Sequence, residues 1–188
     1  MTGPADGPVS VRLVRTSDAA QLVDALTTSR HHLADSFPAG WAERLNLGAQ
    51  EARITQSLAR AAEGTSWPGV IVSRSGRLLG RIALDDIVRD NRLSCFLSYW
   101  LSVDACGHGY ATAAVQLVLD LAFNELGLHR VEAFVRPANT KSLAVLNRAG
   151  FERIGVAQRH TFVGSDWQDE VLLQRLAPWD SPGRLSPP

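Results

Sequence analysis

The spacing of apolar residues changes twice in the second half of this chain, and this change constrains the fold more than any other feature. Extended runs over residues 93–103 and 129–135 flank a segment with a different period. In that segment the apolar residues recur at helical spacing, at Ala111, Ala114, Val115, Val118, Leu119 and Ala122. A strand–helix–strand unit forces its two strands to run parallel in one sheet.

The other elements follow from apolar period and from turn residues. Strands are expected over 11–15, 68–73, 78–88, 93–103, 129–135, 154–163 and 168–176, the last two forming a hairpin around Gly164-Ser165-Asp166. Helices are expected over 16–30, 48–63, 109–127 and 139–149. The order predicts an α+β fold with a mixed, mostly antiparallel sheet of about seven strands, a central parallel pair and about four helices.

Composition indicates one globular domain. The chain has 188 residues, of which 45% are hydrophobic and 20% charged. Gly- and Pro-rich ends predict disordered tails over 1–9 and 178–188, and therefore a single domain over 10–177. The two cysteines, Cys95 and Cys106, lack metal-ligand spacing, so no metal site is expected.

Charge and hydropathy narrow the possible partners and the location. Nineteen basic residues balance nineteen acidic ones, and there is no Lys/Arg run, which argues against a dedicated nucleic-acid binder. No apolar run approaches the roughly 20 residues that span a bilayer. The first residues lack the basic and apolar regions of a signal peptide. These features predict a cytoplasmic protein that does not associate with a membrane.

A glycine-bearing turn precedes the helix of the parallel unit, in Asp104-Ala-Cys-Gly-His-Gly-Tyr-Ala-Thr-Ala-Ala-Val115. The first amides of a helix are unpaired and carry a partial positive charge, and glycines let an anion approach them. The turn therefore favours a bound pyrophosphate, although a plain strand-to-helix turn has the same residues. It is neither a Walker loop, since no Gly-Lys-Ser/Thr follows, nor a G-x-G-x-x-G fingerprint, since Thr112 stands at the last position.

Several segments together resemble one enzyme family. They are Tyr99-Trp100-Leu101, Cys106-Gly-His-Gly-Tyr-Ala-Thr112, Asn139-x-x-Ser142 with Leu146 and Gly150-Phe151, and Trp167-x-Asp169. This combination is similar to the GCN5-related N-acetyltransferases (GNAT), and especially to their ribosomal-protein N-terminal acetyltransferase (RimJ/RimL-type) branch. The resemblance spans about residues 10–176 in element order and is sharpest over 97–152. Cys106 departs from the usual Arg or Gln, and His108 stands where a basic residue is common.

The resemblance implies that the parallel strands splay apart and that acetyl-CoA lies between them. Backbone groups near Leu101 and Val103 would bind the pantetheine arm, and one amide there would polarise the thioester carbonyl. The pyrophosphate would lie on the turn formed by Cys106, Gly107, His108, Gly109, Tyr110, Ala111 and Thr112. Drift at a tolerant position accounts for Cys106 better than a redox sensor does, and solvent exposure fits His108 better than a phosphate contact.

The resemblance also implies direct attack of an amine on the thioester, with no enzyme nucleophile. Ser142 would protonate the departing thiolate, unless it only satisfies a local amide in the first helical turn. Asn139 is expected as the helix N-cap and as a coenzyme A contact. The base is less defined: His160 is the candidate in the final hairpin, and Asp85 and Asp86 are alternatives. His31 and His32 are expected at a solvated helix end.

The expected activity is acetyl-CoA-dependent N-acetylation of a primary amine, in a ternary complex. The acceptor is either a protein N-terminal α-amine or a small-molecule amine, and another acyl group remains possible. A non-catalytic coenzyme A-binding module is the alternative from a different class; it would bind coenzyme A without releasing thiol from acetyl-CoA. Dimers are common in the branch, so a homodimer is possible.

Overall fold

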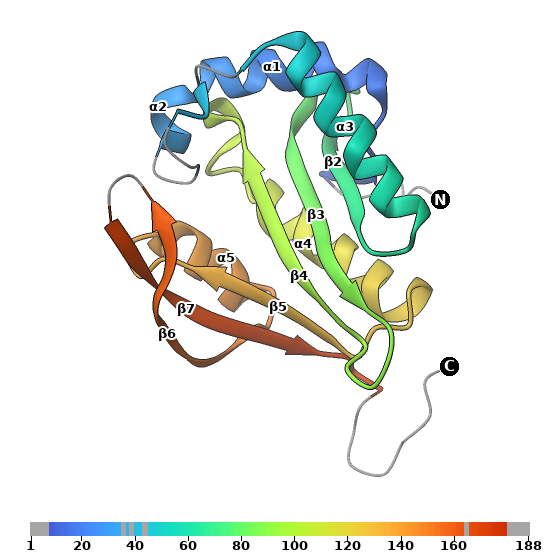
Figure 1. The fold of residues 1–188 in the computed structure, drawn as a ribbon, viewed down its shortest axis with the longest axis vertical. Helices are drawn as coiled ribbons and strands as arrows, with labels where there is room; N and C mark the ends of the chain where they lie inside the picture. The colour runs from blue at the N-terminus through green and yellow to red at the C-terminus, as the bar shows by residue number, and fades with distance from the viewer. Residues whose placement is uncertain (1–7, 35–36, 38–39, 43–44, 164–165, 180–188) are drawn as a thin grey trace.

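A seven-stranded mixed sheet forms the centre of the molecule (Figure 1). The structure is a computed structural model that describes residues 8–34, 37, 40–42, 45–163 and 166–179. The strand order is β1-β2-β3-β4-β5-β7-β6. The strands are β1 (Val9–Leu13), β2 (Trp67–Ser73), β3 (Leu78–Val88), β4 (Ser94–Leu101), β5 (Arg130–Val135), β6 (Glu152–Val163) and β7 (Asp166–Leu176). Among the described strands only β4 and β5 pair in parallel, which confirms the fold expected from the change of period.

Helices cover both faces of this sheet (Figure 1). They are α1 (Ala19–Thr28), α2 (Arg30–Leu33), α3 (Leu47–Ala62), α4 (Tyr110–Asp120) and α5 (Thr140–Arg148). Short 3-10 turns, η1 (Thr16–Asp18) and η4 (Val103–Ala105), precede α1 and α4, and a wider π turn, η5 (Leu121–Glu125), follows α4. In the described part of the chain α1 and α3 lie over one face, and α4 and α5 lie over the other.

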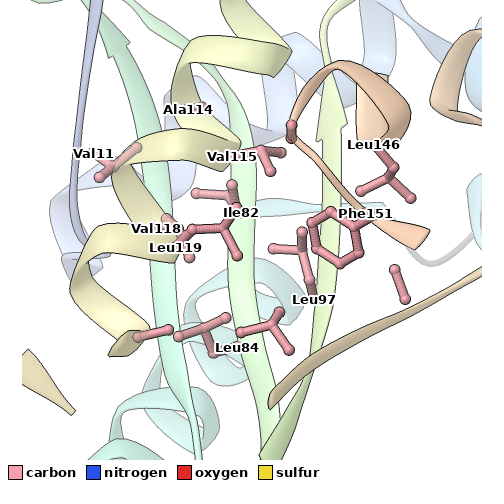
Figure 2. Close-up of a cluster of buried hydrophobic side chains, with 14 of the residues drawn as sticks. Val11, Ile82, Leu84, Leu97, Ala114, Val115, Val118, Leu119, Leu146 and Phe151 are labelled. Carbon is pink, nitrogen blue, oxygen red and sulfur yellow. The ribbon is translucent and has the colours of Figure 1, made fainter. Parts of the chain in front are cut away.

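The larger hydrophobic core lies between the sheet and α4 and α5 (Figure 2). Ile82 and Leu84 of β3 contact the apolar stripe of α4, and Val115 and Val118 of that stripe are fully buried. Leu146 brings α5 into the same cluster. Each fully buried aliphatic side chain contributes about 1.5–3 kcal/mol relative to exposure. This core therefore fixes α4 and α5, and with them both motif-bearing segments, on one face of the sheet.

A smaller core joins α1 and α3 to the opposite face, through Leu22, Ile54 and Val70. A bidentate ion pair ties this layer to β1: two Arg12 nitrogens each lie 2.8 Å from an Asp18 carboxylate oxygen. Burial alone would raise the pKa of Asp18, but hydrogen bonds from Arg12 and from the Arg15 amide outweigh it and hold that pKa below its ordinary value. Asp18 thus remains ionised and fixes the start of α1.

Several element boundaries differ from those expected. The segment over 16–30 is not one helix but η1, α1 and α2, because Asp18 reaches back to the Arg15 amide and Ser29 leaves helical geometry. β1 begins at Val9, inside the expected tail. Trp179 lies against the core beyond the expected domain end, at the point where the second tail should begin. The expected turn residues Gly164 and Ser165 and the ends 1–7 and 180–188 lie outside the described residues.

Strands β4 and β5 separate soon after they begin. Their register joins only Ser94–Phe96 to Arg130–Glu132, whereas β4 continues to Leu101 and β5 to Val135. Beyond this short ladder, and within the part of the chain that the structure describes, β4 pairs only with β3, and β5 only with β7. Figure 1 shows the two strands diverging from their shared start. Two unpaired strand edges therefore face each other in the middle of the sheet.

Candidate active site

The turn before α4 has the geometry of an anion-binding loop. Gly107 and Gly109 both adopt left-handed backbone conformations, with φ of 82° and 76°, which side-chain-bearing residues rarely adopt. Within the described residues, the amides of 107–112 donate no hydrogen bond; the first to do so is that of Ala113, to the Gly109 carbonyl at 3.1 Å. A Cβ added at either glycine would have no atom within 4 Å. The loop thus offers open space and unpaired donors, which fits a diphosphate.

The loop's side chains at His108 and Cys106 contact other side chains of the protein. His108 is exposed and stacks on Tyr110, with ring centroids 5.4 Å apart. The Cys106 thiol lies 3.5 Å from His32 Nε2 and 3.5 Å from the Ser102 carbonyl. Burial raises the pKa of Cys106, although the charge of Lys141 opposes the shift. No residue pattern indicated the His32 contact, which depends on α2 lying beside the loop.

The backbone expected to bind the pantetheine arm is partly engaged within the protein. The Val103 amide donates to Ser29 Oγ at 2.9 Å, and the Val103 carbonyl accepts from the Cys106 amide at 3.3 Å. Leu101 pairs with Gly80 of β3 and closes the β3–β4 ladder. A Cβ at Gly80 would lie 2.1 Å from the Trp100 carbonyl, so only glycine permits this close approach of β3 to β4. The free edge of β4 therefore lies on the β5 side.

A cavity of about 230 Å³ lies between the separated strands. Leu97, Ser98 and Tyr99 of β4 line one side, and Ala133, Phe134 and Val135 of β5 line the other. Further polar side chains that line it are those of Arg136 after β5, Asn139 and Ser142 at the start of α5, and Glu170 of β7. The resemblance places a thioester in this gap, and the gap exists because the β4–β5 ladder stops at Phe96 and Glu132.

The hydroxyls of Tyr99 and Ser142 meet at the wall of this cavity, with 2.8 Å between Tyr99 Oη and Ser142 Oγ. Burial raises the pKa of Tyr99 to about 12, while the Ser142 hydrogen bond lowers it. The phenol therefore stays protonated at neutral pH, and its one proton can go either to Ser142 Oγ or to the Ser142 carbonyl, 3.4 Å away. When the phenol donates to Oγ, the Ser142 hydroxyl can direct its own proton into the cavity. Sequence reasoning singled out Ser142 but used Tyr99 only as part of a family motif.

Asn139 is the N-cap of α5. Its Oδ1 accepts a hydrogen bond from the Ser142 amide at 3.1 Å, which fixes the first helical turn. The same side chain lines the cavity, so the capping role and a contact to a bound molecule are compatible. The Ser142 hydroxyl, for which a local amide was one of two expected partners, contacts Tyr99.

His160 lies beside the cavity, not in its lining. Its Nδ1 lies 2.7 Å from Glu170 Oε2, and its ring stacks on Phe134 with centroids 4.2 Å apart. The His160 side chain is 41% exposed, whereas that of Glu170 is 14% exposed and lines the cavity. Glu170 was missed in the sequence. It follows Gln168 and Asp169 in a polar run, so the residue pattern does not distinguish it from the solvent-facing residues of a strand.

The alternative carboxylates are engaged elsewhere. Asp85 accepts a hydrogen bond from Ser98 Oγ at 2.8 Å and lies 3.4 Å from Arg60. Asp86 lies in a positive-φ irregularity of β3, 3.6 Å from the same arginine, and its side chain is 73% exposed. Neither lines the cavity between β4 and β5. No helix in the described ranges has the length and apolar character that crossing a bilayer requires.

Comparison with known proteins agrees with this geometry. Residues 9–152 match the acetyltransferase (GNAT) domain family. The chain is 37% identical over 132 residues to "Probable N-acetyltransferase YjcK" of Bacillus subtilis, a match that covers 70% of this chain and 73% of the relative. It is 26% identical over 183 residues to the [ribosomal protein uS5]-alanine N-acetyltransferase of Escherichia coli, which covers 93% and 90% of the two chains.

A solved structure shares the whole architecture. Mycobacterium smegmatis RimJ, determined in complex with CoA-disulfide, superposes with a TM-score of 0.88 at 33% identity, over 94% of this chain and 87% of that one. The expected resemblance to RimJ/RimL-type enzymes is therefore confirmed. With a matched family domain over most of its length, this chain belongs to the GNAT family of N-acetyltransferases.

Proposed function

We propose that this GNAT enzyme transfers an acetyl group from acetyl-CoA directly to a primary amine in a ternary complex. The observation that carries the proposal is the cavity between β4 and β5, which has a hydroxyl pair on one wall and a carboxylate on another. The anion-binding loop begins at the end of β4, so one extended molecule can reach both features. The similar structure of Mycobacterium smegmatis RimJ, determined in complex with CoA-disulfide, supports the choice of donor.

Bound acetyl-CoA would supply an activated acetyl group. The amides of 107–112 would hold its diphosphate through the partial positive charge at the start of α4. In the cavity, Ser142 would donate a proton toward the departing sulfur, while Tyr99 donates to Ser142 Oγ and stabilises the charge that develops there. No side chain has to attack the thioester, because the incoming amine is the nucleophile.

The acceptor we favour is the α-amine of a protein N-terminus. The support is the similarity to the uS5-alanine N-acetyltransferase of Escherichia coli over nearly the whole chain. A small-molecule amine is the competing acceptor, and it would use the same cavity chemistry.

Thiol release from acetyl-CoA tests this proposal. The protein is assayed with a peptide that begins with alanine, the same peptide with a blocked N-terminus, and a set of small alkyl amines. We expect release with the free peptide and none with the blocked one. Thiol release only with small amines would mean that the acceptor is a small-molecule amine and not a protein N-terminus. Binding of coenzyme A without release in any assay would support the non-catalytic module instead.

A further inference from the structure

Different functional groups line the cavity between β4 and β5 from the two faces of the sheet. Tyr99 lies on the α4–α5 face, because its neighbours Leu97 and Leu101 are buried in that core. Val171 and Leu173 of β7 are buried in the same core. Because successive residues of a strand point to opposite faces, Glu170, next to Val171, points to the other face. A proton donor and a carboxylate thus line one cavity from opposite sides.

Only one oxygen of Glu170 is occupied within the described residues. Oε2 is 2.7 Å from His160 Nδ1 and accepts a hydrogen bond from Thr161 Oγ1 at 2.8 Å. Oε1 has no hydrogen-bond partner in that part of the structure. The carboxylate is therefore fixed in orientation by two contacts and keeps one oxygen available to a ligand.

A distortion of β6 creates this arrangement. Consecutive strand residues normally point to opposite faces, yet His160 and Thr161 both reach Glu170. The β6–β7 register shifts between Ala157 and Thr161, and Arg159 adopts φ 48° within that shift. Such bulges redirect side chains. The stack of His160 on Phe134, a cavity-lining residue, holds the ring in place.

We infer that Glu170 Oε1 receives the acceptor's ammonium group and takes its proton, with His160 and Thr161 as positioning residues. The inference rests on the proposed acetyl transfer. One nitrogen proton passes to Oε1 and then to solvent. The nitrogen lone pair forms the C–N bond, and the C–S bond breaks. The second nitrogen proton reaches the sulfur by way of the Ser142 hydroxyl, so atoms and charge balance. The ligand class is a cationic primary amine that enters from the face opposite α5.

The test compares wild type, Glu170→Gln and the control Glu152→Gln, which changes an exposed carboxylate at the start of β6. Each is assayed with an α-amine peptide, whose ammonium has a pKa of about 8, and with an alkyl amine, whose pKa is about 10.4. At pH 7 the free-base fraction is about a tenth for the first amine and about 4 in 10,000 for the second. Loss of a base should therefore affect the alkyl amine more.

We expect Glu170→Gln to lower kcat/KM for the amine by about 100-fold near pH 7, the lower end of the range for a general base, with KM for acetyl-CoA unchanged. The deficit should shrink as pH rises toward the pKa of the amine, because solvent then removes the proton. Among the described residues, His160 on the carboxylate and Arg136 in the cavity lining are the charged or titratable groups that face Glu170, and both are kept in every variant. Glu170→Asp, which retains a carboxylate, should recover part of the rate.

Two results would overturn the inference. One is an unchanged kcat/KM in a folded Glu170→Gln protein; the other is a loss that is equal at every pH and equal for both amines. If wild type acetylates no amine although it binds coenzyme A, the proposed function itself fails. If wild type is active and Glu170→Gln is equally active, only the role of Glu170 fails. Coenzyme A binding is measured separately for each protein. Thermal unfolding of each variant verifies that the comparison is made between folded proteins.

Discussion

The hydrogen bond between Tyr99 and Ser142 makes a quantitative prediction about catalysis. Ser142→Ala removes the proposed proton donor, so kcat should fall by about 100-fold, at the lower end of the range for general acid catalysis. Tyr99→Phe removes only the phenol hydroxyl that donates a hydrogen bond to Ser142 Oγ. A hydrogen bond that strengthens as charge develops contributes about 1.4 kcal/mol here, which corresponds to about a tenfold loss of kcat.

The double variant separates a coupled pair from two independent residues. If Tyr99 acts through Ser142, then Tyr99→Phe has no further effect once Ser142 is alanine, and the double variant loses about 100-fold. Independent effects would multiply to about 1,000-fold. The assay is steady-state thiol release with saturating amine, with calorimetry of coenzyme A binding as the control. A multiplicative loss, or full activity of Ser142→Ala, would refute the reasoning.

The same contact predicts a pH dependence of stability. Burial raises the pKa of Tyr99 from its ordinary value of 10.0 to about 12 in the folded protein. The unfolded chain therefore releases this proton first, and the stability that Tyr99 contributes is fully present below about pH 10 and lost as pH rises toward 12. The shift of two pKa units corresponds to about 2.7 kcal/mol. By pH 11, midway between the two pKa values, about half of this, roughly 1.4 kcal/mol, is lost. Cys95, whose pKa burial also raises to about 12, loses stability over the same range in both proteins. In denaturant unfolding at pH 9 and pH 11, wild type should therefore lose about 1.4 kcal/mol more than Tyr99→Phe does.

Two further predictions concern the loop and the thiols. Gly109→Val should raise KM for acetyl-CoA by about tenfold, because valine strains the left-handed turn by about 1–2 kcal/mol and fills the space beside the amides; Gly76→Val, at another open left-handed turn, is the matched control and should leave KM unchanged. In a thiol-labelling time course the half-buried Cys106 should react and Cys95 should not, because Cys95 is 1% exposed and burial raises its pKa to about 12. Equal labelling of both thiols in the folded protein would contradict this assignment.

Local sequence signals predicted the features that depend on neighbours along the chain. The parallel pair followed from the helical spacing around Val115 between two extended runs. The loop before α4 followed from Gly107 and Gly109, whose left-handed conformations only glycine adopts easily. The N-cap at Asn139 followed from its position before an apolar periodic segment.

The features that were missed depend on contacts between distant residues. Tyr99 meets Ser142 only because α5 lies against β4, 43 residues away in sequence. The pairing of His160 with Glu170 depends on a bulge in β6, and no turn residue marks that bulge in the sequence. The separation of β4 from β5 after Phe96 is likewise a property of the assembled sheet. Here the family resemblance supplied the splay, and residue patterns alone did not.

A crystal structure of the protein with coenzyme A bound tests the central claim most directly. We expect the diphosphate on the amides of 107–112 and the thiol in the cavity between β4 and β5, within hydrogen-bonding reach of Ser142 Oγ. Coenzyme A bound elsewhere, or a thiol that emerges on a surface away from Ser142 while the diphosphate avoids the loop, would contradict the account.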